Sequence, residues 1–113
     1  MNVQCEVQSS VDIVRPRGRI DSATAGIFER AVAEVFERGS QRLVLDLSRV
    51  DYVSSAGLRA TLIVGKRMRA IPGGKLALCA LAPAVREVFE ISGFVSIFTI
   101  CASLDDAMAA CGP

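Results

Sequence analysis

Short apolar runs alternate with longer amphipathic stretches along most of this chain, and this alternation constrains the fold more than any other feature. Residues 42–47 (RLVLDL) and 75–81 (KLALCAL) are nearly continuous apolar runs, which is typical of strands covered on both faces. Residues 21–40, 55–71 and 82–93 space their apolar side chains three and four positions apart, as amphipathic helices do. This alternation predicts a mainly parallel sheet joined by right-handed crossovers.

The first half of the chain supplies a hairpin and the signals that bound the first helix. Residues 3–8 and 11–15 alternate apolar and polar on either side of two serines, and they predict two antiparallel strands, the second continuing past a proline. Asp21 or Ser22 can cap the start of the first helix, and Gly39 can end it. We interpret residues 48–53 (SRVDYV) as the turn that leads out of the strand at 42–47.

The second half completes the predicted fold. Residues 96–100 (SIFTI) predict a last strand, and residues 103–111 predict a terminal helix that Ser103 caps, with Asp106 placed for a capping box. No repeat or linker interrupts the pattern. The sequence therefore predicts one α/β domain over residues 1–113, with an N-terminal hairpin, a mixed, mainly parallel sheet and about four helices.

The composition argues against several classes of function. With 13 basic and 12 acidic residues the net charge is +1, which gives no sign of a nucleic-acid surface or a polybasic membrane patch. The chain has no histidine, and its four cysteines form no CxxC pair, so we expect no metal and no cofactor. No segment has the length of a membrane span, and the N-terminus does not resemble a signal peptide. We expect a cytoplasmic protein.

Two adjacent serines mark the junction between a strand run and a helix run in VDYVSSAGLR, residues 50–59. Ser54 or Ser55 can serve as an ordinary helix N-cap, and spacing alone favours that role. A phosphoryl group on either serine would carry a charge of roughly −1.5 to −2 beside the unpaired N–H groups of the first helical turn, where the helix dipole favours anions. Ala56 and Gly57 are small, so another protein could approach the backbone closely.

Catalytic readings of the chain are weak. Without histidine there is no Ser-His-acid triad, and PGGK at residues 72–75 lacks the spacing of a phosphate-binding loop. Asp21, Asp46 and Asp51 suggest an acidic, metal-binding pocket, as in a response-regulator receiver. We favour simpler roles, with Asp51 in a turn and Asp46 as a hydrogen-bond acceptor at a strand end. We therefore expect a protein that is not an enzyme.

Three segments together resemble the STAS domain of single-domain anti-sigma factor antagonists. They are GRIDSATAGIFERAV, LVLDLSRVDYVSSAGLRATL and LALCALAPAVREVFEISGF, and the resemblance runs from about residue 19 to the C-terminus, with compatible hairpin strands before it. The resemblance implies a bacterial partner switch. The unphosphorylated antagonist binds a serine-kinase anti-sigma factor, the kinase uses ATP to phosphorylate a serine at the start of the helix, and the antagonist is released. A PP2C-type phosphatase restores the unmodified form.

The resemblance also suggests which residues carry the switch. The family often reads Asp-Ser-Ser/Thr-Gly at this junction, so Ser54 stands in the place of the Asp and Ser55 in the first hydroxyl position. Ser55 is our predicted phosphorylation site, and Ser54 is the second choice. The predicted partner-binding residues are Asp21, Ser54, Ser55, Ala56, Gly57, Leu58 and Arg59.

Two expectations remain open at this point. The role of Asp21 is either that of a residue near the kinase-binding face or that of an N-cap. A bulky residue at Gly57 is expected to impair docking more than stability. A different function is a STAS scaffold subunit, in a stress-sensing assembly or a lipid-transport complex, which uses the same face as a permanent docking surface without phosphorylation.

Overall fold

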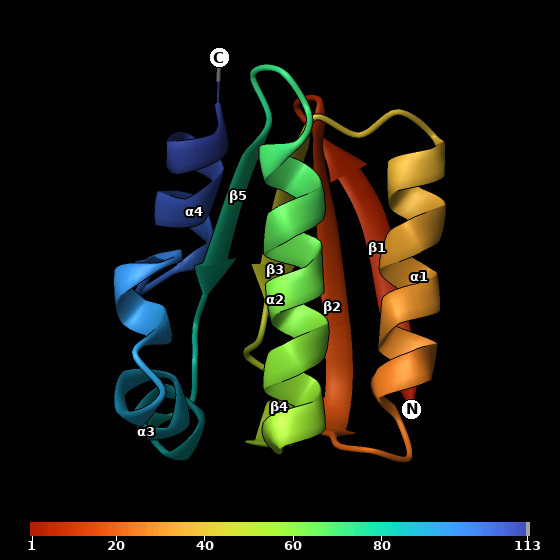
Figure 1. Ribbon diagram of the computed structural model, residues 1–113. Coiled ribbons are helices and arrows are strands. Elements are labelled where there is room, and N and C mark those ends of the chain that lie inside the picture. Colours follow the sequence, from red (N-terminus) through yellow and green to blue (C-terminus); the bar gives the residue numbers. More distant parts are fainter. Residues whose placement is uncertain (113) are drawn as a thin grey trace.

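The computed structural model describes residues 1–112, and its sheet confirms the predicted architecture (Figure 1). β1 (Asn2–Gln8) and β2 (Val11–Ile20) form the antiparallel N-terminal hairpin. β3 (Arg42–Asp46), β5 (Lys75–Cys79) and β6 (Thr99–Cys101) then continue the sheet in parallel, in the order β1-β2-β3-β5-β6. The sheet is therefore mixed and mainly parallel.

The helices also follow the prediction. They are α1 (Ala25–Glu37), α2 (Ser55–Arg69), α3 (Pro83–Ile91) and α4 (Leu104–Cys111). Gly39 lies just beyond the end of α1 with a φ of +90°, so it terminates the helix as expected. Ser103 caps α4, since its side chain accepts the N–H of Asp106 at 3.1 Å. No helix within residues 1–112 has the length and apolar character needed to cross a membrane.

The start of α1 differs from the prediction. The N-cap position belongs to Thr24, not to Asp21 or Ser22. The Asp21 carboxylate instead accepts the N–H of Ala23 at 3.0 Å, and the Asp21 carbonyl accepts the N–H of Ala25 at 2.8 Å. Asp21 therefore closes a turn ahead of the helix, which delays the first helical residue.

Residues 48–53 were wrongly interpreted as a turn throughout. Val50–Val53 form a strand, β4, that pairs in parallel with the last residues of β2. Val50 and Val53 are buried, whereas the two residues between them are exposed, so the strand carries no long apolar run. The tight turn lies earlier, where the Val50 N–H donates to the Leu47 carbonyl at 3.1 Å.

The last strand begins later than predicted. Gly93 adopts a φ of +80° and ends α3, as expected, but a short 3-10 helix, η1 (Phe94–Ser96), follows it. β6 begins only at Thr99. Of residues 96–100, Ser96 ends η1, residues 97–98 form a turn, and only residues 99–100 belong to β6. Periodicity alone does not separate these states in so short a run.

Two apolar layers cover opposite faces of the sheet. Leu43 and Leu45 of β3 belong to the core beneath α1, α2 and α3, whereas Val44 packs with Cys111 of α4 on the other side. α1 and α2 lie side by side in front of the strands (Figure 1). The carboxyl ends of β2 and β4 and the N-terminus of α2 share one end of the molecule.

Candidate functional site

The junction between β4 and α2 is fixed by Ser54, the one residue between the two elements. Its backbone is extended, with φ −90° and ψ 179°, and its hydroxyl oxygen accepts the N–H of Gly57 at 3.4 Å. Its own N–H donates to the Ile20 carbonyl at 3.0 Å. Ser54 is therefore the N-cap of α2, and it ties the start of this helix to the end of β2.

Ser55 has different surroundings from Ser54. It is the first residue of α2 and is exposed. Among the described residues no hydrogen bond is formed by its hydroxyl, whereas the Ser54 hydroxyl accepts the N–H of Gly57. The N–H groups of the first helical turn and the helix dipole favour an anion here. The geometry thus separates the two serines into a structural hydroxyl and an accessible one, which sequence spacing could not do.

Gly57 is a buried residue of the first turn of α2. A Cβ added to it would lie 2.5 Å from the Ile20 carbonyl oxygen and 2.9 Å from Cγ1 of Val53. Its own carbonyl accepts the hydroxyl of Thr61 at 2.9 Å. The expectation that a bulky residue here impairs docking more than stability does not fit this packing, since any side chain forces α2 away from β2 and β4.

Asp21 lies beside this junction, because it follows Ile20, whose carbonyl accepts the N–H of Ser54. Its backbone N–H donates to the Thr24 hydroxyl at 3.0 Å, and Arg19 donates to its carboxylate at 3.4 Å. Desolvation raises the pKa of Asp21, but hydrogen bonds from Ala23, Arg19 and Thr24 outweigh it, so the pKa lies below its ordinary value of 3.8. Asp21 is ionised at neutral pH and holds the β2–α1 turn.

One exposed pair of side chains next to these residues was not predicted from the sequence. The Arg19 guanidinium stacks over the ring of Tyr52, 4.1 Å from its centroid, and the two residues are partners in the β2–β4 register. Tyr52 is 41% exposed. Only the pairing of β4 with β2 brings them together, and that pairing was missed because β4 was interpreted as a turn.

The structure brings the predicted site residues together at one end of the molecule. Ala56 and Leu58 are half-buried in the first turns of α2, and Arg59 is exposed one turn beyond Ser55. Asp21 lies near them because the neighbouring Ile20 carbonyl accepts the N–H of Ser54. The arrangement presents a hydroxyl, a carboxylate and a guanidinium around a helix N-terminus. Binding of a partner to these residues remains a prediction.

The other two acids have structural surroundings. Asp46 is 6% exposed, and its carboxylate accepts Nε of Arg15 at 2.9 Å and the N–H of Ser48 at 3.1 Å. Its role as an acceptor at a strand end is confirmed. Asp51 lies in β4, not in a turn, and is exposed. In the part of the chain that the structure describes, no three side chains of His, Cys, Asp or Glu come together as metal ligands.

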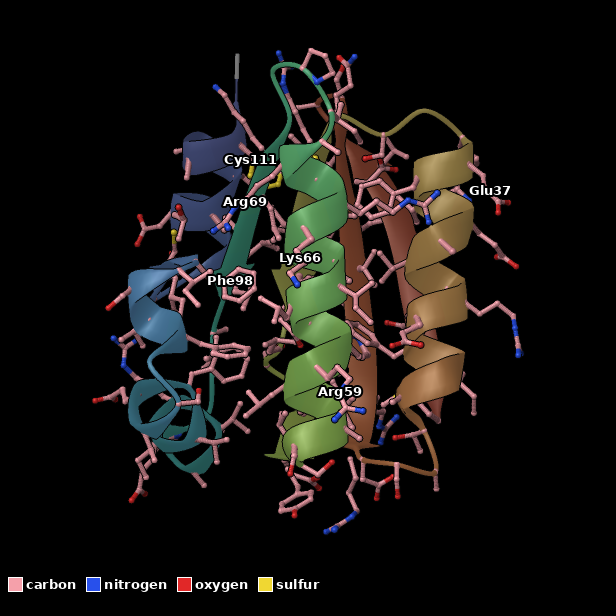
Figure 2. The ribbon with its side chains drawn as sticks, in the orientation of Figure 1. Glu37, Arg59, Lys66, Arg69, Phe98 and Cys111 are labelled. Atoms are coloured by element: carbon pink, nitrogen blue, oxygen red, sulfur yellow. The ribbon has the colours of Figure 1, made fainter. Side chains whose placement is uncertain are left out.

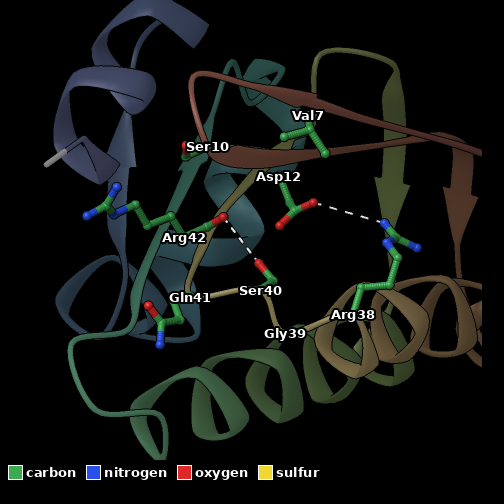
Figure 3. Close-up of a pocket in the computed structure, with 8 residues that line it drawn as sticks. All are labelled: Val7, Ser10, Asp12, Arg38, Gly39, Ser40, Gln41 and Arg42. Atoms are coloured by element: carbon green, nitrogen blue, oxygen red, sulfur yellow. Dashed lines mark hydrogen bonds and ion pairs between the residues drawn. The ribbon is translucent and has the colours of Figure 1, made fainter.

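A hollow of about 380 Å³ lies at the other end of the sheet, between the β1–β2 turn and the α1–β3 loop (Figure 3). Arg38 approaches Asp12 to 4.0 Å there, and the Ser40 hydroxyl donates to the Arg42 carbonyl at 3.3 Å. Asp12 thus balances the charge of Arg38 inside the hollow. None of the predicted site residues lines it. The junction at Ser54 and Ser55 is thus the stronger candidate site.

The sequence of this chain is similar to a known family and to named proteins. The family model described as "STAS domain" matches residues 2–107. The Bordetella bronchiseptica protein BtrV, named as a candidate anti-sigma factor antagonist, is 51% identical over 94 residues, which cover 83% of this chain and 80% of BtrV. The anti-sigma F factor antagonist of Paenibacillus polymyxa is 30% identical over 104 residues, covering 88% of this chain and 87% of that protein.

A solved structure matches over nearly the whole chain. It is the crystal structure of an anti-sigma factor antagonist from Mycobacterium paratuberculosis, with a TM-score of 0.91 and 28% sequence identity. The match covers 97% of this chain and 92% of that one. The order of strands and helices described above is therefore shared with a protein of that class.

Proposed function

This chain belongs to the STAS domain family, and we propose that it is an anti-sigma factor antagonist that works as a phosphorylation-controlled partner switch. In its unmodified form it binds a serine-kinase anti-sigma factor and thereby frees that factor's client. The kinase transfers the γ-phosphoryl group of ATP to the Ser55 hydroxyl, and the antagonist is released. A PP2C-type phosphatase removes the phosphoryl group. The protein acts in the cytoplasm as a substrate and ligand, without a cofactor or catalysis of its own.

The observation that carries this proposal is that the two serines have different roles in the structure. Ser54 caps α2, so a change at Ser55 leaves the helix cap in place. Ser55 is exposed, and its hydroxyl is available to a kinase. A phosphoryl group at Ser55 adds roughly −1.5 to −2 charges to the contact surface while the first-turn N–H groups stabilise it. The fold is preserved, and the docking surface changes its charge.

Release follows from electrostatics and solvation. A dianion placed inside a protein interface must lose its water shell, and it repels any carboxylate of the partner that faced the hydroxyl. Like-charge contact in an interface costs several kcal/mol, and each 1.4 kcal/mol changes affinity about tenfold. One phosphoryl group is thus sufficient to dissociate a complex of ordinary affinity.

The test is copurification from the native organism with tagged wild type, Ser55→Ala, Ser55→Asp and Ser54→Ala. We expect wild type and Ser55→Ala to recover one ATP-binding anti-sigma factor stoichiometrically. Added MgATP should release it from wild type but not from Ser55→Ala, and Ser55→Asp should bind it weakly while remaining folded. Ser54→Ala is the matched control, which should still be released by MgATP.

Two results would overturn the proposal. Ser55→Asp that bound the factor as tightly as wild type would remove the electrostatic basis for release. A partner that copurifies from all four variants and stays bound in MgATP would favour the permanent scaffold subunit.

A further inference from the structure

Helix α2 carries only positively charged side chains among its ionised residues. Four of its 15 residues are basic and none is acidic. These four, which we term the basic face, are Arg59, Lys66, Arg67 and Arg69. All are exposed, and within residues 1–112 none of them pairs with a carboxylate. Cations without an intramolecular counter-charge are available to an anionic partner.

The basic face continues directly from the candidate site. At 100° per residue, Arg59 and Lys66 lie about 40° and about 20° from Ser55 around the helix axis. Ser55 therefore stands at the N-terminal end of a line of cations. Figure 2 shows Arg59 and Lys66 on the side of α2 that faces away from the sheet. A partner that covers Ser55 and extends along α2 must cover these charges.

Exposed apolar surface also lies within the basic face. Ile63 is 47% exposed on α2, and Ile27 is 41% exposed on the neighbouring α1. Between these helices is a depression of about 30 Å³, lined by Val32, Phe36, Ile63, Val64, Arg67 and others. Arg67 also stacks over the Phe36 ring, 4.7 Å from its centroid. The depression has room for the tip of one apolar side chain.

This combination favours a protein over a nucleic acid. Nucleic-acid surfaces are strongly basic over a whole face, whereas this chain has a net charge of +1, and Glu29 lines the same depression. Exposed apolar side chains beside arginines are typical of protein interfaces. We propose that the basic face, with Ile63 in its centre, docks an acidic segment of the anti-sigma factor whose apolar side chain contacts the α1–α2 depression.

This inference rests on the proposed function and adds a reason for the switch. Arg59 lies four residues after Ser55, the spacing at which opposite charges on a helix pair. A phosphoryl group on Ser55 therefore engages Arg59 and reduces the net charge of the basic face from +4 to about +2. The modification thus weakens attraction for an acidic segment as well as repelling groups that faced the hydroxyl.

The test uses the anti-sigma factor recovered by copurification, purified and titrated calorimetrically against three proteins. They are wild type, the double variant Lys66→Glu/Arg69→Glu, and the control Arg17→Glu/Arg86→Glu, whose positions are exposed on β2 and α3. Both doubles change the net charge from +1 to −3, because each replaces two cations by two anions (+1 − 4 = −3). Titrations at 50 and 300 mM NaCl separate screened attraction from other contacts.

We expect the α2 double to bind at least about tenfold more weakly at low salt and to lose the salt dependence of wild type. The control double should bind within about threefold of wild type. Equal affinity of both doubles and wild type would overturn the docking proposal while the release by MgATP still supported the proposed function. A labelled DNA duplex that bound wild type but not the α2 double would also overturn it. Failure to recover any anti-sigma factor would remove both proposals at the earlier step.

Discussion

Replacement of Gly57 by alanine tests the packing that positions the candidate site. The added Cβ would lie 2.5 Å from the Ile20 carbonyl oxygen, about 1 Å closer than a relaxed contact. That oxygen is held in place, since it accepts the N–H of Ser54. Overpacking costs about 1–3 kcal/mol, and a clash with a backbone oxygen that cannot move aside falls in the upper part of that range, about 2–3 kcal/mol. The better helix propensity of alanine returns about 1 kcal/mol. We therefore expect a net destabilisation of about 1–2 kcal/mol.

Gly26 provides a matched control in α1. It is also helical, but a Cβ there meets no atom within 4 Å. Gly26→Ala should therefore stabilise the protein by about 0.5–1 kcal/mol, through reduced entropy of the unfolded chain. Urea unfolding followed by circular dichroism gives both values. The reasoning is wrong if Gly57→Ala proves as stable as wild type or more stable, particularly if it matches Gly26→Ala.

Three further predictions concern single features of the chain. Ser54→Ala should lower the free energy of unfolding by about 1 kcal/mol because it removes the α2 cap, whereas Ser55→Ala should change it by less than about 0.5 kcal/mol. Equal losses for the two variants in urea titrations would contradict the assignment of the cap to Ser54. Ser9 and Ser10 in the β1–β2 turn both adopt positive φ, 52° and 65°, a conformation that Asn and Gly adopt at lower cost. The double variant Ser9→Asn/Ser10→Gly should therefore have a higher melting temperature than wild type, and a lower melting temperature would show that the turn is not strained. Asp21 has a lowered pKa, so its contribution to folding stability is present above pH 3.8 and is lost as the pH falls below that value. In Asp21→Asn the free energy of unfolding should therefore fall less steeply with acidification than in wild type, and an equal fall in both proteins would exclude the effect.

The sequence was sufficient for the long elements and insufficient for the short ones. β3 and β5 are buried on both faces, and α2 has caps and spacing that periodicity detects. β4 has four residues, of which two are exposed, and it is a strand only because β2 extends far enough to pair with it. Tertiary pairing, which local sequence does not encode, decided that element.

The candidate site was predictable in its composition but not in its division of roles. Two adjacent serines at a strand–helix junction indicate a cap, yet either one satisfies the pattern. The backbone hydrogen bond from Ser54 to Ile20 fixes the register, and it leaves the Ser55 hydroxyl exposed. The burial of Gly57 against Ile20 follows from the same contact between β2 and α2. These facts depend on residues more than 30 positions apart in the chain.

The most direct test of the switch is the intact mass of the protein purified from its native cells, followed by fragmentation that locates any modification. We predict a population carrying one phosphoryl group on Ser55, and none on Ser54, whose hydroxyl caps α2. An unmodified mass under every growth condition, with the partner always bound, would contradict the switch and leave the junction as a permanent docking surface.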